Sequence, residues 1–593
     1  MSEGLRAAKR AGQHRERVMK KVGLWVVVAV IALLILTGVG VHRWFNPPSP
    51  AAQLFFNGTV LTMDPQRPVA DAMLVRHGEI VALGEAEVLR KQVSRDVMVV
   101  DLEGGTLMPG FIEAHGHFPG EGLSAVAVDA NSPPIGDLHS IDTLLERLGL
   151  LAQRRSEGAL LAYGFDHTAI TEQRYPTRSE LDSVSETRPI VVMHRSGHFG
   201  VVNSAALSSM GIKEEVTDPA GGFYGRDETG RLNGLLAETA FNPVRSKALA
   251  LASMDTLKVV SRASHIYLSR GITFAQNGLA GPAAIRALEP ALQFGLIPLR
   301  LSVWPNAEAE QQRQSGKLDI PEGDRIHLGP VKLVSDGALQ GYSGFLSAPY
   351  YSLPDDYPED YLGFPTLSQQ ALNDQVQQFH CQGRQVAVHA NGDAAIEQSL
   401  NAIAAARSAC PQARVQPVLI HAQMATPEQL ERMVALDVIP SFYNIHVYYW
   451  GDRHRDIFLG PERARRISPL AQAAQAGLRF TLHADSPGVP FEPLQLVWNA
   501  VERKTASGAL LGPEQAVDVE RALQAVTVDA AKQLGVADQV GQLRPGMRAD
   551  LVWMDRDPRE AISDWREIQV LGTWVGGVRR YPSGEAERPR SAM

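Results

Sequence analysis

A pair of histidines in the first third of the sequence has the spacing of a metal site. His115 and His117 are separated only by Gly116 and follow the apolar residues Phe111 and Ile112. In an extended strand, residues i and i+2 point to the same face, so both imidazoles could reach one cation. Polar histidines in a loop explain the motif equally well when it stands alone. The pair therefore predicts a metal site only if other ligands join it.

Four more polar residues interrupt apolar runs that have the composition of buried strands. They are Lys332 in VKLVSDG, His389 in QVAVHA, His421 in PVLIHAQ and Asp485 in RFTLHAD. Strands of a parallel barrel are buried on both faces and are normally apolar, so these residues need an explanation. A single core histidine is more often structural, but several such residues at successive strand ends favour a common site.

Lys332 has two explanations. Its stem could lie along the sheet while its ammonium group reaches water. Alternatively, Lys332 is desolvated and neutral, and it reacts with carbon dioxide to give a carbamate that serves as a carboxylate-type ligand. Four imidazoles with such oxygens suit one or two Zn²⁺ ions, with another divalent transition metal as the alternative. His483 lies further down its strand and is expected to be structural.

Eight apolar β runs, each followed by a helical stretch, could position these residues. The runs are 106–117, 271–276, 298–304, 331–337, 385–390, 417–423, 438–443 and 479–485. Eight strands alternating with helices predict a (β/α)8 TIM-like barrel of the α/β class. The candidate ligands fall where the strands end, and that face is where barrel enzymes assemble their sites.

The rest of the chain divides into further predicted units. Short β runs near both ends predict one small β-sandwich domain formed by residues 53–108 and 541–585. The barrel takes residues 109–119 and 254–540, and residues 120–253, too many for a loop, form an inserted α/β subdomain after the first strand. The insert is expected to lie over the barrel mouth.

The N-terminal segment predicts membrane attachment. Residues 1–21 are basic, residues 22–42 are predominantly apolar, and residues 43–52 are rich in proline. An apolar stretch of this length fits one transmembrane helix between a cytoplasmic tail and a short linker. The prediction is a single-pass protein in contact with the lipid bilayer, its catalytic domain outside the cytoplasm and periplasmic in a Gram-negative cell. A cleaved secretory signal is the alternative.

Composition excludes several classes of protein. The formal net charge of −8 over 593 residues offers no basic field, so no nucleic-acid partner is expected. Cys381 and Cys410 are too few for a disulfide framework, and we expect ordinary buried residues, with their pairing left open. The oligomeric state is also open, a homo-oligomer included.

The ligand set resembles that of the amidohydrolase superfamily. His-x-His, Lys, His, His and Asp occur in that order on the first, fourth, fifth, sixth and eighth predicted strands. The segments PGFIEAHGH, VVMHRSGHFGVVNSAAL, VKLVSDGAL, VHANGDAAI, HADSPGVPFEPL and QVGQLRPGMRADLVWMDRDP are similar to the amidohydrolase 3 branch, which contains N-substituted formamide deformylases. The resemblance covers about residues 53–585. It implies that His115, His117, Lys332, His389, His421 and Asp485 are metal ligands, with Lys332 carbamylated.

The expected activity is hydrolysis of an amide-type C–N bond in a small N-acyl, formamide-like or cyclic amide substrate. A divalent metal makes water reactive at neutral pH, and Asp485 could accept the proton of that water and pass it to the departing nitrogen. His198, Asn203 and Asp336 are candidate substrate contacts, although a structural role explains each of them as well. The alternatives are the same site acting on an ester, lactone or phosphoester, and an inactive barrel acting as a scaffold.

Overall fold

A barrel of parallel strands forms the centre of the molecule. The computed structural model describes residues 40, 46–93, 97–248, 253–354 and 357–582. The barrel strands are β8 (Phe111–Ile112), β15 (Ile272–Ala280), β16 (Arg300–Pro305), β18 (Val331–Val334), β19 (Val386–Ala390), β20 (Val418–His421), β21 (Ile439–Phe442) and β22 (Thr481–Leu482). Each overlaps one of the eight predicted runs.

These strands form two parallel arcs, β8-β15-β16 and β18-β19-β20-β21-β22. A further short strand, β17 (Ile326–Leu328), pairs with β16. A parallel bridge between Asn306 and Lys332 joins the arcs on one side. On the other side, the backbone N–H of His117 donates a hydrogen bond to the carbonyl of Ser486 at 2.7 Å. The segments that follow β8 and β22 are therefore held together.

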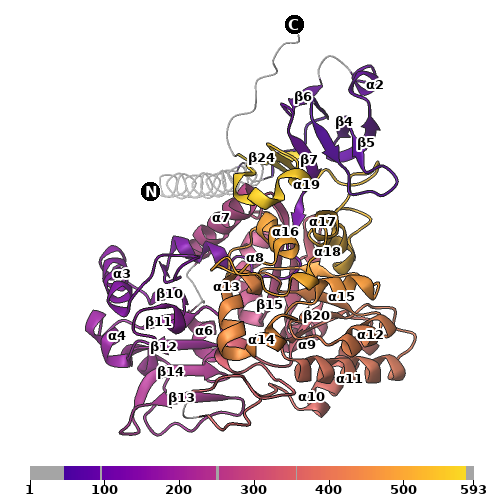
Figure 1. The fold of residues 1–593 in the computed structure, drawn as a ribbon. Coiled ribbons are helices and arrows are strands. Elements are labelled where there is room, and N and C mark those ends of the chain that lie inside the picture. Colours follow the sequence, from indigo (N-terminus) through magenta and orange to yellow (C-terminus); the bar gives the residue numbers. More distant parts are fainter. Residues whose placement is uncertain (1–39, 41–45, 94–96, 249–252, 355–356, 583–593) are drawn as a thin grey trace, which may run out of the picture.

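Helices surround the barrel (Figure 1). They are α7 (Ser253–Ser269), α8 (Pro282–Gln293), α9 (Ala307–Gln314), α10 (Gln369–Cys381), α11 (Asp393–Ala409), α12 (Pro427–Ala435), α13 (His446–Arg453), α14 (Gly460–Ala464), α15 (Leu470–Gln475), α16 (Pro493–Glu502), α17 (Val519–Ala525) and α18 (Val528–Gln533). Local sequence sets their starts. Ser368 caps α10 by accepting from the N–H of Ala371, and Thr426 and Gln429 form a capping box at α12.

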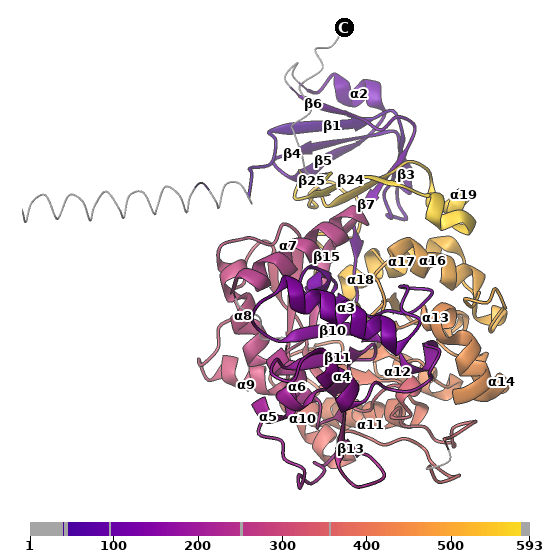
Figure 2. The same cartoon turned by 90° about the vertical axis from the view of Figure 1, so that its left-hand side faces the viewer.

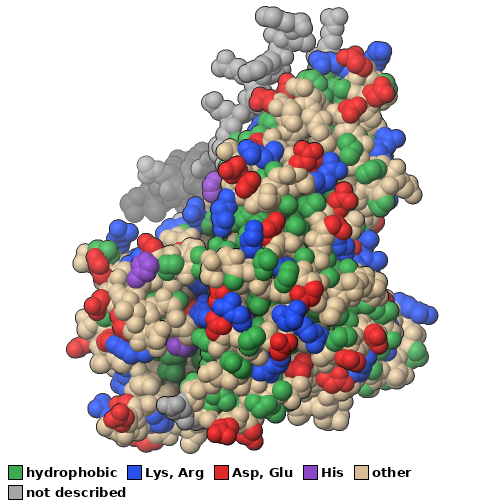
Figure 3. Space-filling model, in the orientation of Figure 1, with side chains coloured by type: hydrophobic (Ala, Val, Ile, Leu, Met, Phe, Trp, Pro, Cys, Tyr) green, Lys and Arg blue, Asp and Glu red, His purple; other side chains and the backbone are tan. Residues whose placement is uncertain are grey.

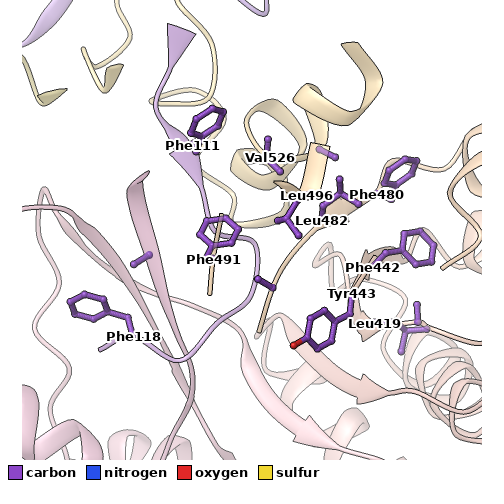
Figure 4. Close-up of a cluster of buried hydrophobic side chains, with 14 of the residues drawn as sticks. Phe111, Phe118, Leu419, Phe442, Tyr443, Phe480, Leu482, Phe491, Leu496 and Val526 are labelled. Carbon is purple, nitrogen blue, oxygen red and sulfur yellow. The ribbon is translucent and has the colours of Figure 1, made fainter. Parts of the chain in front are cut away.

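The core below the barrel mouth is apolar. Phe111, Phe442 and Leu482 come from three barrel strands and are fully buried, and Figure 4 shows them among other aromatic and aliphatic side chains of the same cluster. Burial of such side chains is worth about 1.5–3 kcal/mol each, so this cluster supplies a rigid base for the polar residues above it.

A second unit, at the top of Figure 1, contains strands from both ends of the chain. One sheet has the order β25-β24-β23-β7-β2-β3, and the other β5-β4-β1-β6. Its elements are β1 (Ala52–Phe56), β2 (Thr59–Leu61), β3 (Val69–Ala70), β4 (Ala72–Arg76), β5 (Glu79–Gly84), α2 (Ala86–Arg90), β6 (Met98–Asp101), β7 (Thr106–Pro109), β23 (Leu551–Met554), α19 (Pro558–Ala561), β24 (Val570–Val575) and β25 (Val578–Tyr581). Because β7 is followed at once by β8, this unit is attached directly to the first barrel strand.

A third unit lies between β8 and β15 in the chain. Its sheet has the order β13-β14-β12-β11-β10-β9. The elements are β9 (Val128–Asp129), α3 (Ile141–Arg154), β10 (Leu160–Phe165), α4 (Arg178–Val184), β11 (Ile190–His194), β12 (Phe199–Val202), α5 (Ser204–Ser209), β13 (Gly222–Arg226), β14 (Leu232–Glu238) and α6 (Asn242–Ala248). In Figure 2 this unit lies in front of the barrel, and an ion pair of 3.0 Å joins its Asp166 to Arg453 at the end of α13.

The surface carries charges of both signs. On the face shown in Figure 3, Lys and Arg side chains alternate with Asp and Glu side chains, and apolar side chains lie between them. A mixed surface of this kind produces no extended field of one sign on that face.

The predicted membrane attachment needs correction. Among the described residues, no helix combines the length and the apolar composition required to cross a bilayer. This finding contradicts the predicted single-pass membrane location, and the predicted contact with lipid has no support. The predicted span 22–42, apart from Gly40, and the basic tail 1–21 lie outside the described residues.

The expectation for the two cysteines also needs correction. Cys381 and Cys410 are half-buried and form a disulfide, with their Cα atoms 5.3 Å apart. The bond joins the last residue of α10 to the residue that follows α11. Sequence alone cannot show that two cysteines in neighbouring helices lie within reach of each other.

Candidate metal centre

The six predicted ligands lie together at the mouth of the barrel. A continuous series of short distances connects them, starting at Lys332 and ending at His389. The series is Lys332 Nζ to His115 Nε2 3.1 Å, His115 Nε2 to Asp485 Oδ1 3.3 Å, His117 Nε2 to Asp485 Oδ1 3.1 Å, Asp485 Oδ2 to His421 Nε2 4.0 Å, and His421 Nε2 to His389 Nδ1 3.0 Å. Six side chains from five strands thus meet in one place.

The ends of the barrel strands position these side chains. His115 and His117 follow β8, His421 is the last residue of β20, and Asp485 follows β22. His421 and Asp485 have positive φ angles of 73° and 53°, which are uncommon for residues with a Cβ. Strained backbone of this kind is often retained at functional sites, where it aims a side chain.

Asp485 is held as a carboxylate between two histidines. Burial opposes its charge, but the hydrogen bonds from His115 and His117 keep the pKa of Asp485 well below its usual value. Burial and the nearby Lys332 lower the pKa of His115 well below its usual value. A neutral imidazole beside an ionised carboxylate is the state in which both groups bind a metal.

Lys332 is buried within β18, with only 3% of its surface exposed. Its Nζ contacts His115 and lies near the negative charge of Asp485, but burial dominates and lowers the pKa of Lys332 to about 7. The side chain does not extend to water, so the first of the two explanations given for this lysine does not hold.

His389 and His421 each have one ring nitrogen fixed by the protein. His389 Nε2 lies 3.2 Å from the carbonyl oxygen of Gly337, and His421 Nδ1 lies 3.1 Å from Nε2 of His483. His483 in turn contacts Ser441 at 2.9 Å and is fully buried. His483 therefore orients His421, and the two opposite nitrogens of His389 and His421 face the centre.

Several polar atoms of this cluster have no partner within the described part of the chain. They include His115 Nδ1 and, beside His389, Asn391 Oδ1, both buried. The contacts of Asp485 Oδ1 are the imidazoles of His115 and His117. Ligand atoms of His115, His421 and Asp485 all lie within 4.8 Å of one another, a spacing that suits one cation. Imidazole nitrogens with a carboxylate oxygen form the donor set of zinc and related transition metals. The residues present therefore fit a metal ion.

A buried network under the centre was not predicted from the sequence. Ser486, next to Asp485, donates to Glu113 Oε1 at 2.8 Å, and the hydroxyl of Tyr267 donates to Glu113 Oε2 at 2.9 Å. Burial raises the pKa of Glu113 to about 8. Glu113 precedes His115 by two residues, the same spacing that separates His115 from His117. In an extended chain this spacing puts residues on one face, and it could have indicated that Glu113 supports the centre.

The inserted unit contributes one predicted substrate contact to the centre. The ring of His198 lies 5.8 Å from the ring of His389, and its Nδ1 is 2.7 Å from Glu238 Oε2. Burial opposes protonation, but the charge of Glu238 outweighs it and raises the pKa of His198. A hydrogen-bond donor held by a carboxylate therefore faces the ligands from above.

Two predicted substrate contacts have structural roles instead. Asn203 is fully buried and caps α5, accepting hydrogen bonds from Ala206 and Ile190 and donating to Ser185 and Arg188. None of its polar atoms is left for a substrate.

Asp336 is also fully buried rather than at the mouth. It accepts backbone hydrogen bonds from Phe345, Asn391 and Gly392 at 2.9–3.0 Å, and its Oδ1 lies 3.5 Å from His389 Nε2. It fixes the loop after β19 and helps to orient His389.

Tyr443 is a further residue at the centre that sequence reasoning missed. Its ring lies 5.6 Å from that of His421 and 5.2 Å from that of His483. It directly follows β21, the one strand between His421 and Asp485 for which no polar residue was singled out. An aromatic residue at a strand end is ambiguous, because it serves equally well in the core.

Comparisons with known proteins agree with this geometry. The family model described as "Amidohydrolase family" matches residues 98–581. The N-substituted formamide deformylase of Arthrobacter pascens is 30% identical over 89% of this chain and 98% of its own length. Protein LONG AFTER FAR-RED 3 of Arabidopsis thaliana is 26% identical over 95% of this chain and 98% of its own.

Among solved structures, a metal-dependent hydrolase from Pyrococcus horikoshii OT3 superposes with a TM-score of 0.70 at 25% identity. The match covers 86% of this chain and 98% of that one. The family match spans residues 98–581, which include every strand of the barrel. The chain therefore belongs to the amidohydrolase family and is a metal-dependent hydrolase that acts on carbon–nitrogen bonds other than peptide bonds.

Proposed function

We propose that this enzyme hydrolyses an amide-type C–N bond of a small N-acyl, formamide-like or cyclic amide compound, with Zn²⁺ as its metal. The ligands that we propose are His115, His117, Lys332, His389, His421 and Asp485. The observation that carries the proposal is the position of Asp485, whose Oδ1 lies 3.3 Å and 3.1 Å from two imidazoles. The similarity to a formamide deformylase supports the substrate class.

When bound, the metal supplies a water of lowered pKa and polarises the carbonyl of the substrate. The protein's own groups would then move the protons. Asp485, ionised by its two histidine partners, is placed to accept a proton from the water and to deliver it to the departing nitrogen. His198 faces the same space and could donate a hydrogen bond to the substrate oxygen, because Glu238 favours its protonated form.

Lys332 is the one proposed ligand that must change its charge before it can bind a metal. A lysine buried among apolar strand residues, with Nζ 3.1 Å from His115, is poorly placed for an ammonium ion beside a metal. We propose that it is carbamylated, which converts it from a cation into a carboxylate-type ligand. In that form Lys332 would hold one or two ions together with the four histidines and Asp485.

Metal content and substrate selectivity test the reaction. The full-length protein should contain a divalent transition metal, and it should release amine from a panel of formamides, N-acyl compounds and cyclic amides. Esters, lactones and phosphoesters in the same panel test whether the site prefers another bond. A protein without bound metal that hydrolyses none of these compounds would be a scaffold and would contradict the proposal.

Replacement of Lys332 by alanine tests the carbamate. The variant should lose metal and activity, and short carboxylic acids should restore part of both by occupying the position of the missing carboxylate. Lys258→Ala is the matched control, because Lys258 is 60% exposed and lies outside the site. Lys332→Ala protein with normal metal content would refute the role of this lysine as a ligand.

A further inference from the structure

A buried arginine with few partners lies where the inserted unit meets the barrel. Arg195 follows β11 and is only 6% exposed. Its guanidinium donates one hydrogen bond to a described residue, from Nη2 to Asn131 Oδ1 at 3.2 Å, and its Nε is buried without a partner. No carboxylate of the described residues lies within 4.0 Å of it. A guanidinium has five donors and stays charged in proteins, so this side chain is poorly satisfied.

The free energy of such a burial needs an explanation. Removing an unpaired charge from water costs several kcal/mol, and proteins normally supply a counter-charge. The two other buried arginines among the described residues are better satisfied. Arg300 pairs with Asp550 at 2.6 Å. Arg503 has no carboxylate partner, but its guanidinium donates three hydrogen bonds, to the carbonyl oxygens of Leu511, Ser468 and Ile467. The incomplete pairing of Arg195 indicates that its counter-charge comes from a bound molecule.

The backbone of Arg195 lies close to the loop that carries Asp485. A Cβ added to Gly488 would lie 3.6 Å from the carbonyl oxygen of Arg195, 3.3 Å from the hydroxyl of Tyr443 and 3.0 Å from the carbonyl oxygen of Asp485. Arg195 therefore belongs to the segment packed on the loop that carries Asp485. The guanidinium lies over the ring of Trp450, with Cζ 5.5 Å from the ring centroid.

A second cation is the competing explanation for this region. Ligand atoms of Asp166, His167 and His194 lie within 4.8 Å of one another, and His167 Nδ1 and His194 Nε2 are buried without partners in the described structure. However, Arg453 already pairs with Asp166 at 3.0 Å. With Arg195 and Arg453 against one aspartate, the cluster carries an excess positive charge, which attracts an anion and disfavours a metal ion.

We infer that Arg195 is a specificity-determining residue that binds a carboxylate carried by the substrate. A carboxylate matches the planar fork of a guanidinium in geometry and charge. Trp450 fixes the guanidinium from the barrel side, and Asn131 fixes it from the insert. The inference rests on the proposed function and narrows it, because the preferred substrates become N-formyl or N-acyl amino acids rather than neutral amides.

Matched pairs of compounds test this inference. N-formylphenylalanine and N-formylphenylalanine amide differ only in the charged group, and each is compared on the wild-type enzyme, Arg195→Gln, Arg195→Lys and the control Arg147→Gln. Arg147 lies on the same insert and pairs with the exposed Asp137. In Arg195→Gln, kcat/KM for the acid should fall by roughly 50-fold, the usual effect of losing a charge-assisted pair. The amide should change less than about 3-fold, which is within the scatter of a neutral change.

Binding is measured separately from turnover. The acid should raise the Tm of the wild-type protein and of Arg147→Gln but not of Arg195→Gln, and Arg195→Lys should retain part of the shift. The Tm of Arg195→Gln without ligand should equal or exceed that of the wild-type protein, because the substitution removes an uncompensated buried charge. A merely structural arginine would give a lower Tm.

The two proposals can fail separately. Acid that binds through Arg195 but is not hydrolysed would overturn the proposed reaction and leave the anion site standing. Equal hydrolysis of acid and amide, with both reduced alike in Arg195→Gln, would overturn the anion site and leave the reaction standing. Failure of the acid to shift the Tm of the wild-type protein would also overturn the anion site. The anion site would likewise be overturned if the wild-type protein bound an additional equivalent of metal and His194→Ala lost that equivalent.

Discussion

The two ends of the barrel bury charged groups in different ways. At the end that contacts the two-sheet unit, Arg300 Nε donates to Asp550 Oδ2 at 2.6 Å and Nη2 donates to Oδ1 at 3.1 Å. The backbone of Gly576 also donates to Asp550, at 2.8 Å. At the mouth, the described residues leave His115 Nδ1 and Arg195 Nε buried without a hydrogen-bond partner, and the carboxylate of Asp485 has imidazoles as its neighbours.

Complete pairing within the protein is typical of structural polar groups, whereas buried polar atoms left unpaired are typical of a binding site. Each buried polar atom without a partner costs about 1–3 kcal/mol, and native proteins keep few of them. The paired end joins the barrel to the two-sheet unit. There, hydrogen bonds within the protein satisfy the buried charges of Arg300 and Asp550. The mouth leaves polar atoms of His115 and Arg195 unpaired, and a bound ligand is one way to satisfy such atoms.

Asp485→Asn should have the largest effect. The amide cannot accept a proton from water, so kcat/KM should fall by about 10⁴-fold, equivalent to about 5.5 kcal/mol of lost transition-state stabilisation. The unfolding temperature should change little, since the side chain keeps its shape. Steady-state kinetics and calorimetry measure the two effects, and an active variant would reject the role proposed for this residue.

Asp550→Asn should break the paired end instead. Removing this partner leaves the buried Arg300 only the exposed carboxylate of Asp324, 3.9 Å away, as a counter-charge. Loss of one partner of a buried ion pair destabilises a protein by about 3–5 kcal/mol. Denaturant unfolding measures this loss, while the activity of the remaining folded molecules should be unchanged. Unchanged stability would mean that the contact between the barrel and the two-sheet unit does not depend on this pair.

Removal of the metal should lower the free energy of unfolding, because the mouth loses its ligand while the paired end is unchanged. A ligand present at a hundred times its Kd adds about 2.7 kcal/mol of stability, and chelation should remove that amount. The Tm should fall in the chelated wild-type protein and recover when Zn²⁺ is added. A control with Lys332→Ala should show no difference between chelated and zinc-loaded samples. Equal shifts in both proteins would place the bound metal elsewhere.

Asn203→Ala should have the smallest effect. It removes the cap of α5 and should cost about 1–2 kcal/mol of stability. Because the side chain is sealed inside the insert, KM and kcat should stay at their wild-type values. A raised KM in folded protein would return this residue to the substrate pocket.

The sequence predicted the barrel strands, and the six side chains proposed as ligands lie together at the mouth of the barrel. It could do so because a polar residue within an apolar strand run is rare, and five of the eight runs carry a polar residue that was singled out as a candidate ligand. The same reasoning failed where a polar residue has a second common use. An asparagine such as Asn203 can line a pocket or cap a helix. An aspartate such as Asp336 can lie at the mouth or accept hydrogen bonds from backbone N–H groups. Only the three-dimensional contacts separate these uses.

Features that depend on distance between remote segments could not be predicted. The disulfide between Cys381 and Cys410, the network of Glu113 with Ser486 and Tyr267, and the poor pairing of Arg195 all depend on which helices and loops meet. Composition also misled in one case, because an apolar stretch near the start of the chain suggested a membrane location that the described residues do not support.

The sheet shared by both ends of the chain has a consequence for biosynthesis. Strand β7 pairs with β2 on one side and with β23 on the other, and Trp553 donates a hydrogen bond to the carbonyl of Leu102, 451 residues earlier. During translation, one edge of β7 stays unpaired until β23 has left the ribosome. His115 and His117, two of the proposed ligands, follow β7 and β8, so a nascent chain anchors them fully only when synthesis is almost finished.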